Sequence, residues 1–338
     1  MSYKKSYKKL RKYQYNWFAL SCTLFLFPIV IIFVTIFSIA FVPYLFKYKR
    51  SGIGKGGQEL NTLSDLEYDG QVKKMPKYNI KENSYKEFFI GNEEEKISVL
   101  TMEHENSDKW VIGVHGFKRN KYIGVRNVFH FYKEGYNILT FDAYAHGKTY
   151  GKKSDFGLTN SKILDVLVEW IKKTKKTSKI GILGVSMGAT TSLMFAKNYY
   201  LKNKVDWIIA DCPFMQAIPQ IRFFLQKYTK LPWWLGTLWI NFLFRLHSKT
   251  NIKEVNLFWG YEKIKDLPIL YIHGKIDDFI MYDNSVVMHY KKSLFDNNKE
   301  NLIIYDNAKH SQSIVNNYKD YTTRTLNFAS KYNNTKTK

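Results

Sequence analysis

The chain has 338 residues, of which 45% are hydrophobic and 24% are charged, so it is long enough for one large domain or two small ones with a real core. This composition excludes a disordered, fibrous or collagen-like protein. The net charge of +23 suggests attraction to anionic surfaces such as phospholipid or wall polymers. Only two cysteines, Cys22 and Cys212, are present, and they provide no disulfide framework.

A long apolar run near the amino terminus predicts a membrane segment. No charged side chain occurs between Lys12 and Lys47. Because about 20 predominantly apolar residues suffice to span a bilayer, we expect one transmembrane helix at residues 17–42. Pro28 is expected to kink this helix, and Pro43 to mark its exit from the membrane.

The charges that flank the apolar run indicate its orientation. Six Lys and Arg precede the run and four follow it, and the more basic flank of a membrane helix usually faces the cytoplasm. We therefore expect residues 1–16 to form a basic cytoplasmic tail and a single-pass anchor to hold the globular part outside the cell. Two alternatives stay open: the opposite orientation, and cleavage of a signal peptide after Ser38-Ile39-Ala40.

Residues 43–85 are expected to form a linker that leads into the globular domain. The basic, glycine-rich stretch at residues 51–57 has the composition of a flexible spacer. No strand is predicted before these glycines and no Gly-Lys-Ser/Thr sequence follows them, so they do not indicate a phosphate-binding loop. A polar tail is expected at residues 331–338.

The rest of the chain alternates predicted strands with predicted helices. Short apolar runs bounded by turn residues predict buried strands. They lie at Phe88–Ile90, Ile97–Met102, Trp110–Val114, Asn137–Phe141, Ile180–Val185, Trp207–Ala210, Ile269–His273 and Leu302–Tyr305. Helical patterns cover Ile163–Thr174 and Gly188–Leu201. This alternation predicts an α/β fold, a mostly parallel sheet flanked by helices, with antiparallel pairing left open for the early strands.

A motif with chemical meaning follows the fifth predicted strand. Residues 184–188 read Gly-Val-Ser-Met-Gly, between a strand and the small residues that begin a helix. In a nucleophile elbow the serine adopts a strained turn conformation, so the flanking positions must be glycine, and the amino terminus of the next helix favours negative charge. This context makes Ser186 the candidate nucleophile. The alternative is a tight strand-to-helix turn with an incidental serine.

A serine hydroxyl needs a base that removes its proton and a third group that orients the base. His310 follows the last predicted strand and comes after Ser186 and Asp277, which is the chain order Ser, Asp, His that accompanies this elbow. His115, at the end of an early strand, suits construction of an oxyanion hole, and His146 is expected to pack structurally. Four histidines away from the strand ends are expected to be surface or packing residues: His104, His130, His247 and His289.

The chain resembles the serine α/β-hydrolases, in particular the membrane-anchored, cell-surface hydrolases of low-GC Gram-positive bacteria. The resemblance covers residues 86–328 and implies an α/β-hydrolase domain at residues 86–330. It rests on motifs in the expected order: Val114-His115-Gly116-Phe117, Asp142–Gly147, Gly184–Gly188, Ala210-Asp211-Cys212-Pro213, His273–Asp277 and Lys309-His310. One departure concerns the residues before His146: such hydrolases often carry a basic residue there, and this chain has Ala143-Tyr144-Ala145.

The resemblance implies roles for five residues. Ser186 would be the nucleophile, Asp277 would orient the imidazole, and His310 would be the base that later protonates the leaving group. The backbone N–H groups of Phe117 and Met187 would form the oxyanion hole. The triad needs no cofactor, and no paired Cys/His spacing suggests a metal site.

Two other carboxylates compete with Asp277. Asp278 adjoins it, but the fifth position of His-Gly-x-x-Asp is the usual place of the acid, which favours Asp277. Asp211, after the strand at Trp207–Ala210, could also supply the acid, as happens in some relatives.

Between two predicted strands lies an insertion at about residues 214–265, where this fold commonly carries a cap. It is rich in aromatic residues: Phe214, Phe223, Phe224, Tyr228, Trp233, Trp234, Trp239, Phe242, Phe244, Phe258, Trp259 and Tyr261. Apolar walls over a nucleophile suit an acyl or lipid-like substrate. The alternative for most of these rings is that they pack the cap onto the sheet. Residues 233–243 are also candidates for contact with the membrane interface.

The sequence therefore predicts a membrane-anchored serine hydrolase that cleaves acyl or lipid-like carboxylic esters through an acyl-enzyme intermediate, without a metal or cofactor. A serine peptidase or amidase on the same fold is the second hypothesis, although no extra domain or paired acidic residues that recognise a peptide amino terminus are evident. A non-catalytic cell-surface binding module is the third, and no triad member is lost. Nucleic-acid binding is not expected, because no binding motif accompanies the positive charge.

Overall fold

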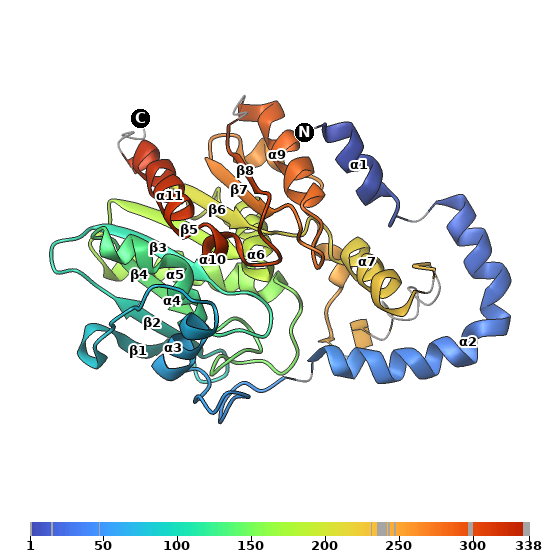
Figure 1. The fold of residues 1–338 in the computed structure, drawn as a ribbon, viewed down its shortest axis with the longest axis horizontal. Helices are drawn as coiled ribbons and strands as arrows, with labels where there is room; N and C mark the ends of the chain where they lie inside the picture. Colours follow the sequence, from blue (N-terminus) through green and yellow to red (C-terminus); the bar gives the residue numbers. More distant parts are fainter. Residues whose placement is uncertain are drawn as a thin grey trace.

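An eight-stranded sheet organises this protein, for which we use a computed structural model (Figure 1). The structure describes residues 2–14, 16–46, 48–230, 232–234, 242, 244–246, 248–296 and 300–333, without the side chains of residues 27, 30, 33, 34, 37, 38, 40–45 and 333. The strands are β1 (Lys86–Ile90), β2 (Ile97–Met102), β3 (Lys109–Val114), β4 (Asn137–Phe141), β5 (Lys179–Val185), β6 (Trp207–Asp211), β7 (Ile269–Gly274) and β8 (Leu302–Tyr305). Each predicted strand is confirmed.

The strand order is β1-β2-β4-β3-β5-β6-β7-β8. β2 pairs antiparallel with both β1 and β4, and the remaining neighbours are parallel. The mostly parallel sheet with antiparallel early strands therefore agrees with the predicted α/β fold. The carboxyl ends of β3, β5, β6, β7 and β8 point the same way, so the loops that follow them meet at one edge of the sheet.

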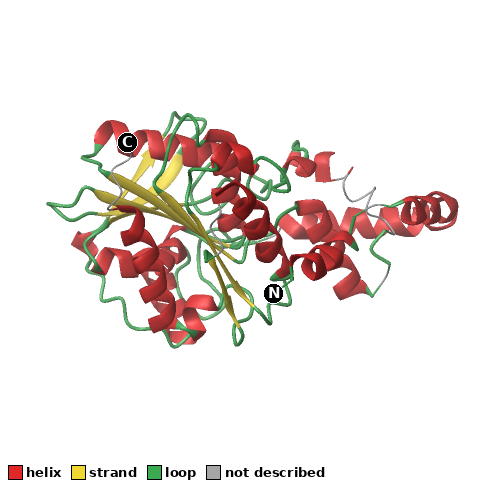
Figure 2. Ribbon diagram, turned by 90° about the horizontal axis from the view of Figure 1, so that it is seen from above, coloured by secondary structure: helices red, strands yellow, loops and turns green. Residues whose placement is uncertain are grey.

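Helices cover both faces of the sheet (Figure 2). The helices that follow α2 are α3 (Leu63–Val72), α4 (Lys121–Lys133), α5 (Leu158–Thr174), α6 (Met187–Tyr199), α7 (Ala217–Thr229), α9 (Asp283–Asp296), α10 (Ser313–Asn316) and α11 (Tyr318–Asn333). α5 and α6 confirm the two predicted helices. The residues of the predicted cap contain α7 and two short 3-10 helices, Ile252–Glu254 and Tyr261–Ile264.

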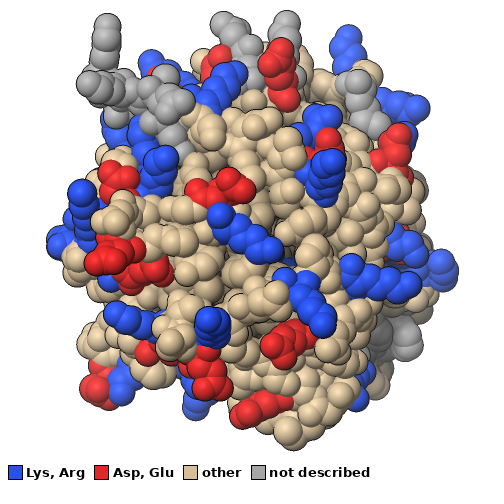
Figure 3. Space-filling view, turned by 60° about the vertical axis from the view of Figure 1, so that its left-hand side comes forward, with Lys and Arg blue, Asp and Glu red and all other residues tan. Residues whose placement is uncertain are grey.

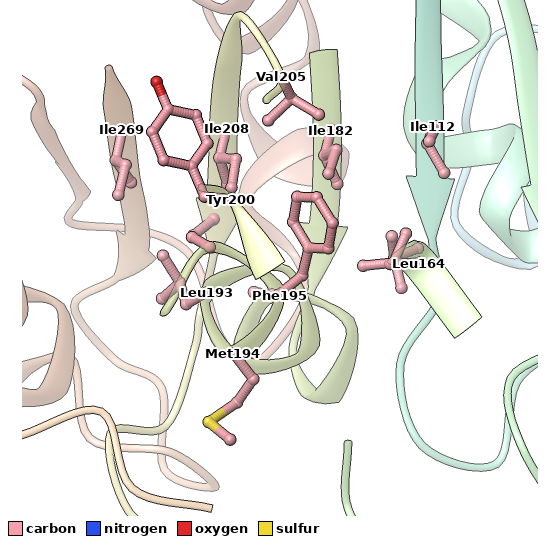
Figure 4. Close-up of a cluster of buried hydrophobic side chains, with 14 of the residues drawn as sticks. Ile112, Leu164, Ile182, Leu193, Met194, Phe195, Tyr200, Val205, Ile208 and Ile269 are labelled. Atoms are coloured by element: carbon pink, nitrogen blue, oxygen red, sulfur yellow. The ribbon is translucent and has the colours of Figure 1, made fainter. Parts of the chain in front are cut away.

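The period-2 alternation of side chains along the strands supplies two hydrophobic clusters, one on each face. On one face Ile112, Ile182 and Ile208 pack with α5 and α6 residues, among them Leu164 and Phe195 (Figure 4). A residue adjacent to each of these belongs to the other cluster, which includes residues of α4 and α11: Val111, Leu183 and Ile209. Because both faces are covered, the central strands are apolar throughout, which is why they could be recognised in the sequence.

The segment predicted as a flexible linker is packed against the domain. Residues 52–60 form a small hairpin closed by a bridge between Ile53 and Glu59. α3 buries Leu66 completely, and Asp69 on α3 accepts a hydrogen bond of 2.9 Å from Arg126 on α4. The composition suggested a spacer, but contacts such as the burial of Leu66 and the buried ion pair of Asp69 with Arg126 anchor this segment.

The amino-terminal residues also lie against the domain (Figure 1). α1 (Tyr3–Arg11) packs on α9, where Lys9 Nζ lies 3.3 Å from Asp283 Oδ2 and the rings of Tyr3 and Tyr290 stack at 3.9 Å. Leu10 of α1 is part of the main hydrophobic cluster. A basic tail separated from the domain by a membrane, as predicted for residues 1–16, would lose these contacts.

α2 (Trp17–Phe46) projects away from the sheet and is bent in Figure 1, and the ring of its last residue, Phe46, lies 5.3 Å from the Phe244 ring. Among the described residues, no helix offers an uninterrupted stretch long and apolar enough to cross a membrane. The structure therefore does not support the transmembrane helix predicted at residues 17–42.

Parts of three predictions fall outside the described residues. These are residues 235–241 of the cap with Trp239, then His247, and residues 334–338 of the polar tail. α11 extends to Asn333, so the last helix continues past the predicted end of the domain at residue 330.

On the face shown in Figure 3, Lys and Arg are spread among Asp and Glu and do not gather into one basic patch.

The packing of α3 predicts the effect of a core substitution. Leu66→Ala should lower the free energy of unfolding by about 2–5 kcal/mol, because it removes a fully buried side chain and leaves a cavity. Val72→Ala, at an exposed position of the same helix, should change it by less than about 0.5 kcal/mol. Urea unfolding of the two variants measures both values, and equal stability would show that α3 is not part of the core.

Candidate active site

Ser186 lies on a sharp turn between the end of β5 and the start of α6. Its backbone has a positive φ of 59° with ψ −121°, a combination outside the regions that L-residues ordinarily adopt. A Cβ added at Gly184 would lie 2.3 Å from the Gly188 carbonyl oxygen, and one added at Gly188 would lie 2.2 Å from the Val114 oxygen. Such distances exclude any side chain, so both glycines are required by close approach of backbone to backbone. The strained turn presents the serine hydroxyl at the sheet edge.

A continuous chain of hydrogen bonds joins Ser186, His310 and Asp277. Ser186 Oγ lies 2.9 Å from His310 Nε2, and His310 Nδ1 lies 2.7 Å from Asp277 Oδ2. Ser186 follows β5, Asp277 follows β7, and His310 follows β8, so the parallel strands bring together residues that are up to 124 positions apart. The structure thus places the three predicted residues in one hydrogen-bonded row.

Asp277 is held from several directions. Its Oδ1 accepts hydrogen bonds from the backbone N–H groups of Phe279 at 2.9 Å and Ile280 at 2.8 Å. Its Oδ2 also lies 3.2 Å from His273 Nε2. Burial by itself would raise the pKa of Asp277, but hydrogen bonds from His273 and His310 outweigh burial and hold this pKa well below its ordinary value. The carboxylate is therefore ionised and fixed at neutral pH.

His273 is a residue whose contribution the sequence did not reveal. It is fully buried, and its Nδ1 lies 2.8 Å from Ser285 Oγ on α9, which fixes the ring beside Asp277. The available signal was its place four residues before the acid in the His-Gly-x-x-Asp motif. Sequence reasoning used that spacing to choose the acid and assigned the histidine no role.

The two competing carboxylates have different surroundings. Asp278 has 73% of its side chain exposed and pairs with Lys227 of α7 at 2.8 Å, and this partner lowers its pKa. Asp211 is buried, and its Oδ1 accepts a hydrogen bond of 2.9 Å from Ser313. Burial raises the pKa of Asp211 to about 6. Neither carboxylate makes the 2.7 Å contact to His310 that Asp277 makes.

The loop after β3 runs directly beside the serine. A Cβ added at Gly116 would lie 3.3 Å from Ser186 Cβ, so Phe117, the next residue, stands close to the hydroxyl. His115 fixes this loop: its Nδ1 bonds to the Gly116 carbonyl at 2.7 Å and its Nε2 accepts the Ala143 N–H at 2.9 Å. Burial lowers the pKa of His115, which keeps the ring neutral and able to accept. Met187, the other predicted donor, opens α6.

Aromatic and aliphatic side chains surround this edge of the sheet. The Phe279 ring lies 4.7 Å from the His310 ring. A separate hydrophobic cluster contains Met187 and reaches the cap, with partly buried residues of α2 and the β3 loop against it: Ala143, Met187, Phe214, Ala217, Phe244, Ile252, Val255 and Ile280, with Phe46 and Phe117. Phe214 and Phe244 are therefore packing residues, whereas Trp259, at 65% exposure, is at the surface.

A cavity of about 410 Å³ lies elsewhere, between the start of α5 and residues 245–254.

One set of donors near the triad has the composition of a metal site. Cys212, Asp277 and His310 each offer a ligand atom, and these atoms lie within 4.8 Å of one another. Two of the three ligand groups are engaged in the hydrogen bond between Asp277 and His310. Burial raises the pKa of the Cys212 thiol, which disfavours the thiolate that a metal would need. The hydrogen-bonded row of Ser186, His310 and Asp277 therefore explains the positions of these side chains better than a metal site does.

Comparisons with known proteins agree with this geometry. The family described as "alpha/beta hydrolase fold" matches residues 109–261. The uncharacterized protein YqkD of Bacillus subtilis is 31% identical over 212 residues, which are 62% of this chain and 68% of that protein.

Solved structures show the same architecture. An esterase of Pyrococcus furiosus is 26% identical, with 73% of this chain and 90% of that chain covered and a TM-score of 0.59. Est1E of Butyrivibrio proteoclasticus, determined with ferulic acid bound, is 18% identical, covers 72% of this chain and 99% of that chain, and has a TM-score of 0.53, a likeness of fold alone. The order of the strands, the elbow at Ser186 and these matches together identify the chain as a hydrolase that belongs to the α/β-hydrolase family.

Proposed function

We propose that this protein is a serine hydrolase that cleaves carboxylic esters of acyl or lipid-like compounds through an acyl-enzyme intermediate on Ser186. The observation that carries the proposal is the hydrogen-bonded row from Ser186 Oγ to His310 Nε2 and from His310 Nδ1 to Asp277, at 2.9 and 2.7 Å. An isolated serine is a weak nucleophile, and this row supplies both the base and the group that orients it.

The reaction follows from the positions of these groups. His310 Nε2 takes the proton of Ser186 Oγ as the oxygen attacks the ester carbonyl. The ionised Asp277 holds Nδ1–H and stabilises the imidazolium that forms. His310 then protonates the leaving alcohol, and a water molecule activated by the same ring releases the acid from Ser186.

The negative charge on the carbonyl oxygen needs donors that are already in place. Met187 N–H is at the first residue of α6, where the helix dipole favours an anion, and Phe117 N–H is on the loop that passes beside Ser186. We assign these two backbone groups to the oxyanion hole. Preorganised donors of this kind are worth about 10²–10³ in kcat each.

Two observations support an ester with an apolar acyl part. The Pyrococcus furiosus protein, 26% identical, is an esterase. Phe117 and Phe279, which pack against the cluster around Met187 and are only partly buried, offer an apolar surface next to the nucleophile. Each buried CH₂ group of an acyl chain contributes about 0.8 kcal/mol to binding on such a surface.

We also propose that α2 attaches the protein to a membrane surface, with both of its ends on the side of the domain. Large apolar side chains on its described part are strongly exposed, among them Trp17 at 84%, Phe25 at 79% and Ile32 at 73%. Ten Lys and Arg in the first 60 residues flank this helix and would attract anionic lipid head groups. A position outside the cell stays a prediction of the sequence.

Covalent labelling tests the proposed function and the location together. Intact cells that express the protein are treated with a membrane-impermeant fluorophosphonate, beside permeabilised cells. We expect labelling of the wild type, no labelling of Ser186→Ala, and retained labelling of Ser192→Ala, a buried serine of α6. Labelling only after permeabilisation would remove the extracellular location and keep the hydrolase. Folded protein without label in both samples would contradict the hydrolase.

The choice of acid is tested by paired substitutions at neighbouring positions. Asp277→Asn should lower kcat on a p-nitrophenyl ester by about 10⁴, because the amide cannot stabilise the imidazolium. Asp278→Asn should leave kcat within about twofold, since this side chain is exposed and faces Lys227. Steady-state kinetics at pH 8 decides between them, and the reverse ranking would assign the acid to Asp278.

Asp211→Asn tests the second buried carboxyl through its pH dependence. The folded pKa of about 6 lies above the unfolded value of 3.8, so this group stabilises the fold below pH 3.8 and loses that contribution as the pH rises through 6. The variant should therefore gain stability relative to the wild type between pH 4 and pH 8, by up to about 3 kcal/mol. Urea unfolding at both pH values measures the gain, and a constant difference would show that Asp211 ionises normally.

A further inference from the structure

The segment that follows α2 docks into the loop after β4. Arg50 donates from Nε to the Gly147 carbonyl at 2.9 Å, from Nη1 to the Gly151 carbonyl at 2.8 Å, and from Nη2 to the His146 carbonyl at 3.1 Å. Nη2 also donates to the Thr149 carbonyl. One guanidinium thus satisfies four carbonyl groups of a loop that has no helix or strand of its own to satisfy them.

Tyr48 reaches the same loop two residues earlier. Its hydroxyl donates to the Ala145 carbonyl at 2.8 Å. Its ring lies 4.9 Å from the His146 ring and meets the Phe117 ring edge-on at 5.6 Å. Tyr48 therefore contacts the loop after β4 and the loop after β3 at once.

His146 connects these two loops by hydrogen bonds. Its Nδ1 bonds to the Tyr144 carbonyl at 2.8 Å, and its Nε2 accepts the N–H of Lys118 at 3.1 Å. Burial lowers the pKa of His146 to about 3, so the ring is neutral and its Nε2 is free of a proton. Lys118 has a left-handed backbone with φ 61°, a conformation that this bond helps to hold.

Phe117 lies between the two fixed points of its loop. On one side His115 holds the Gly116 carbonyl at 2.7 Å, and on the other side His146 holds the Lys118 N–H at 3.1 Å. The Phe117 N–H shares a peptide plane with the Gly116 carbonyl, and the next peptide, which carries the Lys118 N–H, fixes the chain on its other side. A shift of about 1 Å in a catalytic donor can cost about 10²-fold in rate, so the supports of this loop matter for catalysis.

We propose that Arg50 and Tyr48 are positioning residues for the oxyanion hole: they fix the loop at residues 145–151 and, through His146, the Phe117 N–H that faces the reacting carbonyl. The inference rests on the proposed function, because it assigns a task to the Phe117 donor. It makes the residues after α2 part of the machinery that stabilises the transition state.

The proposal predicts a particular kinetic signature. Arg50→Ala should lower kcat by about 10–100-fold and change KM by less than about threefold, because the lost interaction concerns the transition state and not the bound ester. Arg50→Lys should not restore kcat, since an ammonium group cannot reach four carbonyls in the geometry of a guanidinium. Tyr48→Phe removes a single hydrogen bond and keeps the ring, so a smaller loss of about 3–10-fold is expected.

The deciding measurement compares an ester with its thionoester, in which sulfur replaces the carbonyl oxygen. Sulfur accepts hydrogen bonds poorly, so a defect confined to the oxyanion hole should reduce ester hydrolysis much more than thionoester hydrolysis. The full-length wild type, Arg50→Ala, Arg50→Lys and Tyr48→Phe are assayed with both p-nitrophenyl substrates. Lys49→Ala is the matched control, because its side chain is exposed and bonds to the Ile53 carbonyl at 3.2 Å, outside the loop after β4. Thermal unfolding of each variant is recorded in parallel.

A fall of tenfold or more in the ester-to-thionoester ratio for Arg50→Ala, with Lys49→Ala unchanged, is the expected result. An equal loss on both substrates, or no loss, would overturn the proposal even if the wild type is active and labelled by a fluorophosphonate. If Arg50→Ala fails to fold, the same ratio for Tyr48→Phe decides. An inactive, unlabelled wild type would overturn the proposed function itself, and the positioning role with it.

Discussion

The contact on which the site depends is the approach of Gly188 to the carbonyl of Val114. A Cβ at residue 188 would lie 2.2 Å from that oxygen, so α6 starts as close to β3 as two backbones can come. This contact lets the chain turn sharply at Ser186, with its φ of 59°, and brings the β3 loop against the hydroxyl. The hydrogen bond from Ser186 N to the Asp211 carbonyl, at 2.8 Å, ties the same turn to β6. Ser186, the start of α6 and the loop after β3 therefore share one geometric constraint.

Two buried carboxyl groups at this edge have opposite electrostatic surroundings. Asp277 receives hydrogen bonds from His273, His310 and two backbone amides, and its pKa falls. Asp211 has Ser313 as its hydrogen-bond donor, and burial raises its pKa to about 6. When two environments shift the pKa values of two carboxyl groups in opposite directions in this way, the group that receives more hydrogen bonds stays ionised. The burial of both groups is similar, so the number of donors decides which of them can stabilise a protonated histidine.

Short sequence patterns predicted the elements whose structure depends on residues close together in the chain. The central strands are covered on both faces, and their apolar runs were therefore visible, as at Trp110–Val114 and Ile180–Val185. The row of Ser186, His310 and Asp277 could be predicted because each residue follows a strand within a short motif, although their catalytic roles stay a prediction. His273 was not recognised, since its contact with Asp277 depends on how the loop after β7 folds back. Docking of α1 and α3 was missed because it depends on partners far along the chain, among them Asp283 and Arg126.

The contacts of Arg50 with the loop after β4 alter where the functional domain begins. The residues before His146 are Ala143, Tyr144 and Ala145, none of which carries a positive charge, and the loop receives its cation from Arg50, about 100 positions earlier in the chain. A polar loop without regular structure needs partners for its carbonyl groups, and a cation from another segment meets that need as well as a local one. Residues 48–50 therefore belong with the hydrolase domain physically, although their composition is that of a linker. A chain that began at residue 86 would keep Ser186, His310 and Asp277, but it would lack the groups that hold the loops beside them.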